Sequence, residues 1–157
     1  MIVRCRFDKF EQLPVLIRHY GFLPSSVSTL TRGKLYAVYA IIYSGIPYRA
    51  CFNMGQYLVI DDDLRPFLFP TLMFDMVCPH IYGRGWCFRH FAKRSLQDSK
   101  DSILGYEQLV DNVAHFNQVI LDESEGRKIF EQWKISVDNA MKNTTCSCNV
   151  VIETAIT

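Results

Sequence analysis

Three consecutive β-strands are predicted by one continuous segment, KLYAVYAIIYSGIPYRACFNMGQYLVIDDD (residues 34–63), which is dense in β-branched and aromatic residues. The strands would be KLYAVYAIIYSG (34–45), IPYRACFNMG (46–55) and QYLVIDDD (56–63). Ser44-Gly45 is typical of a tight turn, and Asn53-Met54-Gly55 is typical of a short hairpin with glycine in the left-handed conformation. We therefore expect antiparallel neighbours.

Both faces of the first predicted strand are apolar. Leu35, Ala37, Tyr39 and Ile41 alternate with Tyr36, Val38, Ala40 and Ile42. A strand that is apolar on both faces is covered on both faces, or it belongs to a small barrel that is capped. We therefore expect a curved antiparallel sheet, or a small open barrel, from about residue 34 to residue 91.

The sequence between the sheet and the helices alternates short elements with loops. Pro66 and Pro70 exclude a long regular element, although a proline at a first helical position favours a short helical turn from Pro70 to Phe74. WCFRHF (86–91) predicts a further strand. The polar residues 92–104 predict a connecting loop, and NVVIET (149–154) predicts a last strand.

Two amphipathic helices are predicted in YEQLVDNVAHFNQVIL (106–121) and SEGRKIFEQWKISVDNAMKN (124–143), where apolar residues recur every three or four positions. The stripes are Leu109, Val113, Phe116 and Ile120, then Phe130, Trp133, Val137 and Met141. Asp122 or Ser124 would cap the second helix, and the spacing of Asp8 and Glu11 predicts a short helix over residues 8–20. The class is thus α+β, with residues 1–157 as one domain, 34–91 mainly β and 105–142 mainly α.

Composition and charge limit the functions that this chain can have. Its 157 residues carry 17 basic and 16 acidic side chains, and a net charge of +1 argues against nucleic acid as the main partner. Residues 1–97 have a net charge of +6, whereas residues 98–157 have −5. The first residues lack the apolar run of a signal peptide, and the longest apolar run, 35–43, is too short to span a membrane. We expect a cytoplasmic protein whose six cysteines are reduced.

Two side-chain clusters leave alternatives open. Cys78, His80, Cys87 and His90 carry the donor atoms that zinc prefers, but their spacing matches none of the usual ligand pairs. A basic and aromatic set suits single-stranded nucleic acid in part. It consists of Arg84, Arg89, Lys93 and Arg94 with Tyr82, Trp86 and Phe88. A metal-dependent enzyme and a nucleic-acid-binding module are therefore alternative hypotheses.

The acidic run Asp61-Asp62-Asp63 has three interpretations: a solvated turn, a contact for a cationic partner, or a divalent-metal site. Adjacent strand residues do not converge on one ion, which disfavours the metal. The chain contains no Gly-x-Ser-x-Gly elbow and no phosphate-binding glycine loop. We expect no catalytic residues, no cofactor and no small-molecule substrate.

The chain resembles small bacterial immunity proteins of polymorphic or contact-dependent toxin systems. The resemblance is carried by GKLYAVYAIIYSGIPYRACFN (33–53) with its Tyr36-Ala37-Val38-Tyr39 pattern, by YLVIDDD (57–63), by RPFLFPTLMFDMV (65–77), by Gly85-Trp86 and by the tail LGYEQLVDNVAHFNQVILDESEGRKIFEQWK (104–134). It implies a non-enzymatic cytoplasmic inhibitor that binds one cognate protein toxin and blocks its active site. Under that hypothesis the partner-binding residues are Asp61, Asp62, Asp63, Arg65, Glu123 and Glu125.

Overall fold

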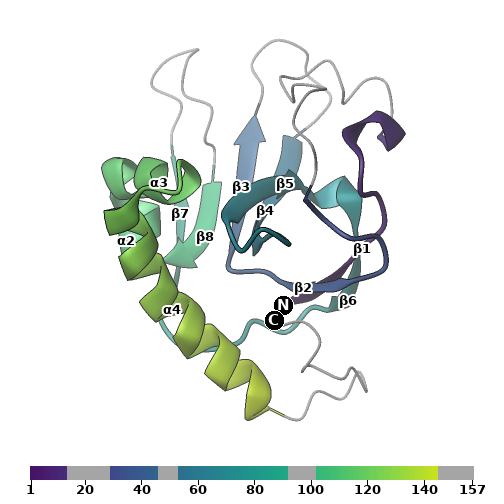
Figure 1. The fold of residues 1–157 in the computed structure, drawn as a ribbon. Coiled ribbons are helices and arrows are strands. Elements are labelled where there is room, and N and C mark those ends of the chain that lie inside the picture. Colours follow the sequence, from purple (N-terminus) through teal and green to yellow (C-terminus); the bar gives the residue numbers. More distant parts are fainter. Residues whose placement is uncertain (14–28, 46–52, 92–101, 145–157) are drawn as a thin grey trace.

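The computed structural model describes residues 1–13, 29–45, 53–91 and 102–144, which form two antiparallel sheets and three α-helices (Figure 1). The smaller sheet has the order β2-β1-β6, with β2 (Leu35–Ala37), β1 (Ile2–Cys5) and β6 (Phe74–Cys78). The larger sheet has the order β5-β4-β3-β8-β7, with β5 (Pro66–Pro70), β4 (Asn53–Ile60), β3 (Ala40–Gly45), β8 (Ser102–Tyr106) and β7 (Trp86–His90). The α+β class is confirmed, and neither sheet closes into a barrel within the described residues.

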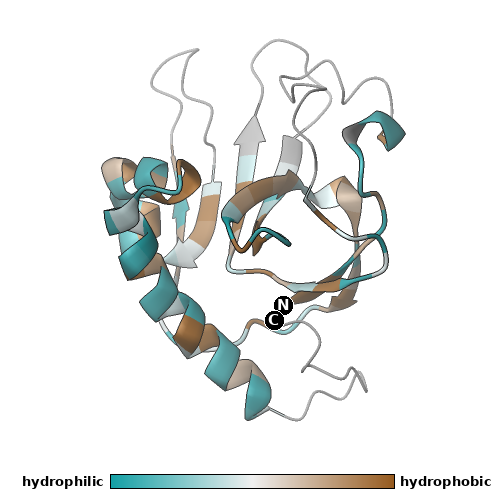
Figure 2. Cartoon of the chain, viewed as in Figure 1, coloured by the Kyte–Doolittle hydropathy of each residue, from teal (hydrophilic) through white to brown (hydrophobic). Residues whose placement is uncertain are grey.

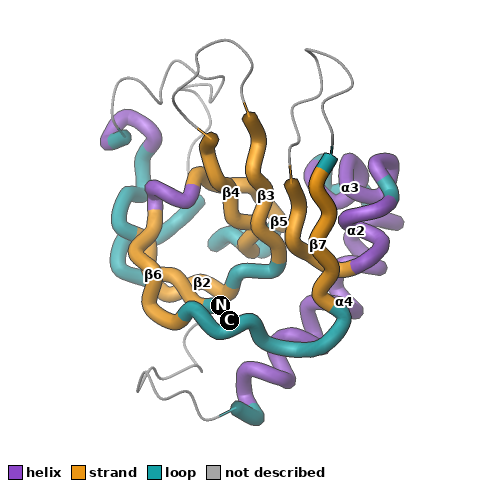
Figure 3. Tube along the Cα trace, turned by 180° about the vertical axis from the view of Figure 1, so that it is seen from behind, coloured by secondary structure: helices purple, strands orange, loops and turns teal. Residues whose placement is uncertain are grey.

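The larger sheet lies between the helices and the smaller sheet, as Figure 1 shows from the front and Figure 3 from behind. One core contains Ile42, Leu58 and Ile103 from the larger sheet together with Phe130 and Met141 from the last helix. The second core joins the two sheets and contains Val3, Tyr36, Ile41, Tyr57, Val59, Phe69 and Phe74. In Figure 2 the strands carry long hydrophobic stretches, whereas the visible side of the last helix is mostly hydrophilic.

The first predicted strand is divided between the two sheets. Val38 and Tyr39 link β2 to β3 and belong to neither strand. Tyr39 and the next residue, Ala40, both face the first core, so the alternation shifts by one residue at this bend. Ile41 and Ile42 consequently lie on the faces opposite to those predicted. Each apolar face of the predicted strand is covered by a different core, as expected for a strand that is apolar on both faces.

The predicted turns at Ser44-Gly45 and Asn53-Met54-Gly55 are wrong, because both segments are paired strand. Gly45 pairs with Asn53, and Tyr43 pairs with Gly55. The residues that connect these strands, 46–52, lie outside the described part of the chain, as does most of the predicted strand 46–55. Close packing explains the glycine at position 55, since a Cβ there would lie 2.9 Å from Thr71 Cγ2.

The helical turn predicted from Pro70 to Phe74 is present as a 3₁₀ turn, η2 (Thr71–Met73), although Pro70 is its N-cap and not its first residue. No long element spans this segment, as expected, but the short strands β5 and β6 on either side of η2 are not among the predicted elements. The strand at 86–90 is also confirmed as β7. The predicted loop 92–104 is wrong at its end, because Ser102 begins β8, which pairs with both β3 and β7. Residues 92–101 lie outside the described residues.

The first predicted helix is two helices, α2 (Glu107–Asp111) and α3 (Val113–Ile120). Asn112 separates them with an extended backbone, and its side chain caps α3 by accepting a hydrogen bond from the His115 amide at 3.1 Å. Because of this break, α2 and α3 do not share the single buried stripe that was predicted for one helix. Leu109 and Phe116 are buried as expected, but Val113 is exposed.

The second predicted helix is α4 (Ser124–Lys142), and its stripe residues Phe130, Val137 and Met141 are buried. The cap prediction is wrong: Glu123 occupies the N-cap position and makes no side-chain cap bond. Asp138 fastens the helix to the link between β2 and β3, because its buried carboxylate accepts a hydrogen bond from the Tyr39 hydroxyl at 2.8 Å. The same carboxylate accepts a second one from Lys134 Nζ of α4 at 2.7 Å.

Two further predictions fall wholly or partly outside the described residues. The segment 149–154 is not described, and of the predicted helix over 8–20 only a 3₁₀ turn, η1 (Phe10–Gln12), is described. None of the helices in the described ranges is long and apolar enough to cross a membrane.

Candidate protein-binding surface

The acidic run forms a tight turn after β4. The Leu64 amide donates to the Asp61 carbonyl oxygen, and the Asp61 amide donates to the Arg65 carbonyl oxygen, both at 3.0 Å. Leu64 occupies the left-handed region with φ of 62°, which is costly for a branched side chain. The same residue exposes 58% of its surface. The turn therefore presents an apolar side chain on a strained backbone.

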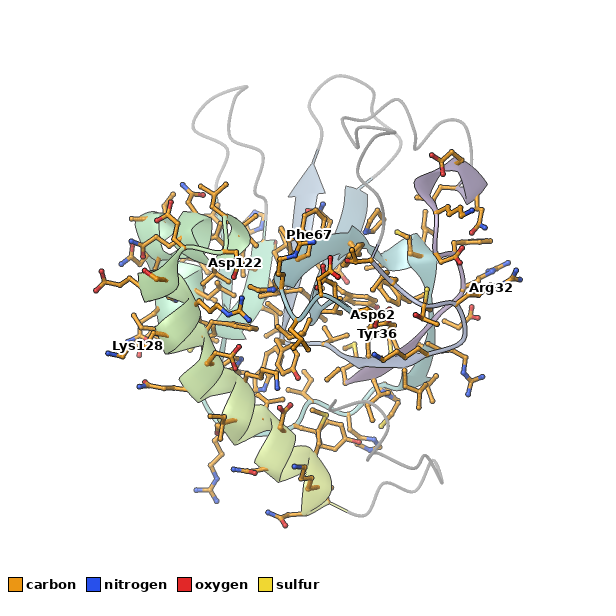
Figure 4. All side chains as sticks on the ribbon, in the orientation of Figure 1. Arg32, Tyr36, Asp62, Phe67, Asp122 and Lys128 are labelled. Carbon is orange, nitrogen blue, oxygen red and sulfur yellow. The ribbon has the colours of Figure 1, made fainter. Side chains whose placement is uncertain are left out.

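Asp61 and Asp62 are used inside the chain. Asp61 is 4% exposed, and its carboxylate accepts hydrogen bonds from the Thr29 hydroxyl and from the Arg65 amide. The Asp62 carboxylate accepts from Thr31 Oγ1 at 2.6 Å, Lys34 Nζ at 2.8 Å and the Tyr36 hydroxyl at 3.0 Å (Figure 4). These two carboxylates hold the turn against the segment before β2, a role that needs no partner protein.

The electrostatics of Asp62 agree with this internal role. Partial burial would raise the pKa of Asp62, but hydrogen bonds from Lys34, Thr31 and Tyr36 outweigh it and hold the pKa below its ordinary value. The carboxylate is therefore ionised at neutral pH and paired with Lys34. Of the four predicted residues in this turn, only Asp63 and Arg65 have exposed side chains, and they form an ion pair at 2.8 Å.

The turn between α3 and α4 supplies the other predicted residues. Leu121 is 69% exposed, and Asp122 has a positive φ of 55°. Glu123 and Glu125 are exposed at the start of α4, where the helix dipole favours carboxylates. Neither glutamate forms an ion pair with another described residue. Their charges are thus open to solvent.

Arg127 joins the two turns. Its Nη2 atom donates to the Leu64 carbonyl oxygen at 2.6 Å, across 63 residues of sequence. Its Nη1 atom contacts both carboxylate oxygens of Asp122, at 2.9 and 3.1 Å. Leu64 follows Asp63 and Asp122 precedes Glu123, so Arg127 brings the two predicted segments side by side. We call the result the Arg127 surface: Asp63, Leu64, Arg65, Leu121, Asp122, Glu123, Glu125 and Arg127.

The Arg127 surface combines exposed apolar and acidic side chains. Leu64 and Leu121 are among the large apolar residues that remain most exposed. Asp63, Glu123 and Glu125 add exposed carboxylates on the same two turns, while Arg65 and Arg127 are already paired with acidic neighbours. Exposed apolar and charged side chains are combined in protein–protein interfaces as well.

The Cys and His side chains of the zinc hypothesis do not converge. Cys78 Sγ lies 3.3 Å from His80 Nδ1, but His90 Nδ1 lies 2.9 Å from Ser102 Oγ. In the described part of the chain, no three His, Cys, Asp or Glu side chains are placed to hold a metal ion. Cys5 and Cys87 are free thiols there.

The basic and aromatic set is only partly assembled. Arg89 forms an ion pair with Asp111 at 2.8 Å, which reduces the charge that it could offer to a phosphate. Phe88 is 66% exposed on β7 and Arg84 is exposed, whereas Trp86 packs against the Trp133 ring with 5.3 Å between centroids. Lys93 and Arg94 lie outside the described residues.

The sequence predicts the acidic turn and the acidic start of the last helix as contact sites, but it gives no signal for Arg127, the residue that joins them. Nothing in the order of residues links Arg127 to Leu64, because the contact depends on how α4 crosses the larger sheet. Comparison of the chain with protein-family models, with curated protein sequences and with solved structures finds no match.

Proposed function

We propose that the chain is a non-enzymatic immunity protein that binds a cognate protein toxin through the Arg127 surface and blocks the toxin's active site. The observation that carries this proposal is the Arg127 bridge, which joins the turn that holds Asp63 to the turn directly before Glu123. Binding would bury Leu64 and Leu121, and the glutamates would face basic groups on the toxin.

The proposal assigns different roles to the predicted site residues. Asp63, Glu123 and Glu125 contact the toxin directly. Asp61 and Asp62 act only by holding the turn in shape, because their carboxylates are engaged within the chain. Occlusion by a rigid surface requires no chemistry from the inhibitor, and preorganisation of the turn lowers the cost of binding.

The first experiment asks whether the chain protects cells. The polypeptide encoded beside this chain would be expressed with and without it, and growth would be measured. We expect growth arrest that the chain relieves, together with a stoichiometric complex of the two in native mass spectrometry. Growth arrest that persists although both proteins accumulate would contradict the immunity function.

A second experiment tests the surface by measuring affinity for the same polypeptide. We expect Leu121→Ala to weaken binding about tenfold, as truncation of a buried interface anchor does. Glu123→Gln combined with Glu125→Gln should lower the association rate about tenfold at low salt. Val113→Ala and Asp75→Asn are matched controls, because both residues are exposed on other elements. Equal losses in the controls would remove the Arg127 surface from the proposal.

A further inference from the structure

His115 is buried at the corner between α2 and α3. Only 3% of its surface is exposed, and it lies in the first turn of α3, directly after the Asn112 cap. The backbone amides of a first helical turn create a positive potential. A positive charge on this imidazole would therefore be unfavourable even before its burial is considered.

Within the described part of the chain, the imidazole has one hydrogen-bond partner for its two nitrogens. Nε2 lies 2.5 Å from the Tyr106 hydroxyl, while Nδ1 is buried and has no partner among the described residues. Tyr106 is itself buried, and its ring packs 5.4 Å from that of Trp133. A neutral imidazole tolerates an unpaired acceptor, whereas an imidazolium carries two N–H donors and would leave one unsatisfied.

The described elements around this corner provide no compensating charge. Burial lowers the pKa of His115, and no carboxylate raises it. On α2, Glu107 is exposed and Asp111 is paired with Arg89 of β7. On α4, the ion pairs are Arg127 with Asp122 and Glu131, and Lys134 with Asp138. On β8 the ionisable group is Tyr106, which is uncharged at neutral pH, and β5 has no ionisable side chain.

We propose that protonation of His115 opens the α2–α3 corner, so that mild acidification acts as a conformational switch on this part of the fold. His115 stays unprotonated while the corner is closed, whereas in the open corner it takes up a proton with the ordinary pKa of about 6.5. The equilibrium constant for opening therefore increases about tenfold for each pH unit below that value, until His115 is also protonated in the closed corner. This inference does not depend on the proposed function.

Amide hydrogen exchange of the intact chain tests the switch. Protection factors of residues 107–120, corrected for intrinsic exchange, should fall about tenfold per pH unit below pH 6.5. Those of β3 and β4 should stay constant over the same range. Uniform protection across the molecule down to pH 5 would overturn the proposal.

Two histidine variants assign the effect to one residue. His115→Gln keeps a group that can bond to Tyr106 and stays uncharged, so the loss of protection at low pH should disappear. His90→Gln is the matched control, because His90 is exposed on β7 and should leave the pH response intact. A pH response that survives in His115→Gln would overturn the assignment.

One measurement needs no variant at all. NMR titration of the wild-type imidazoles should show His115 titrating below 6.5, at the pH where protection at the corner is lost. A His115 resonance that titrates with an ordinary pKa, while the amides of the corner stay protected from exchange, would refute the switch. This holds even if His115→Gln failed to fold.

Discussion

Replacing Asp62 with asparagine should separate the structural role of the acidic turn from its proposed binding role. The carboxylate accepts three hydrogen bonds, at 2.6, 2.8 and 3.0 Å, of which one comes from the charged Lys34. Asparagine retains one oxygen acceptor but loses the charge. A hydrogen bond to a charged group contributes about 1.5–3 kcal/mol, so we expect a loss of about 2 kcal/mol in the free energy of unfolding. For a chain of this size that corresponds to a fall of about 6 °C in Tm.

Urea unfolding measures this change, and Asp63→Asn is its control. Asp63 is exposed and forms an exposed ion pair with Arg65, so its replacement should change stability by less than about 0.5 kcal/mol while weakening partner binding. Because the pKa of Asp62 lies below its ordinary 3.8 in the folded chain, its stabilisation is present above that pH and lost as pH falls through the folded value. The difference between wild type and Asp62→Asn should therefore shrink below about pH 4. Equal stability of the two single variants at neutral pH would refute the reasoning.

Three further substitutions test other parts of the fold. Tyr39→Phe removes the buried hydrogen bond to Asp138 and should lower the free energy of unfolding, measured in urea, by about 2 kcal/mol. A loss below about 0.5 kcal/mol would contradict a stabilising role for this bond. Gly126→Ala would place a Cβ 2.5 Å from Gln118 Cβ and 2.7 Å from its carbonyl carbon, and Tm should fall by an amount equivalent to about 1–3 kcal/mol. A rise in Tm, as helix propensity alone predicts, would contradict that packing argument. Leu64→Gly should relieve the positive φ and raise stability by about 1 kcal/mol while it weakens partner binding, and unchanged affinity in a calorimetric titration would count against the Arg127 surface.

The sequence predicted elements well where the pattern was long and local. The helix at 124–142 and the strand at 86–90 were found because their periodicity or composition is uninterrupted. Its errors occur where a single backbone change redirects the chain. The extended residue Asn112 splits one apolar stripe into two helices, and the bend at Tyr39 carries one apolar run from one sheet to the other.

Two of the missed strands, β1 and β8, depend on partners distant in sequence. β1 is four residues long, and β8 follows a polar run, so neither has a strong pattern of its own. Ile2 and Val3 are buried because β1 pairs between β2 and β6. Likewise β8 is a strand because it fills the position between β3 and β7. Tertiary pairing, which a single sequence does not encode locally, decides both.

The candidate surface illustrates the same division between local and distant information. Aspartates at a strand end and glutamates at a helix start are local signals, and both were read from sequence. What makes them one surface is the planar guanidinium of Arg127, whose two terminal nitrogens reach a carbonyl oxygen on one turn and a carboxylate on the other. A lysine ammonium in the same place is a single point charge and lacks this fixed fork.

Both turns contain a non-glycine residue with positive φ, Leu64 and Asp122, and each of those residues supplies the oxygen that Arg127 binds. The arginine thus stabilises the two strained turns together, which keeps Leu64 and Leu121 exposed in a fixed arrangement instead of letting either turn relax and withdraw its apolar side chain.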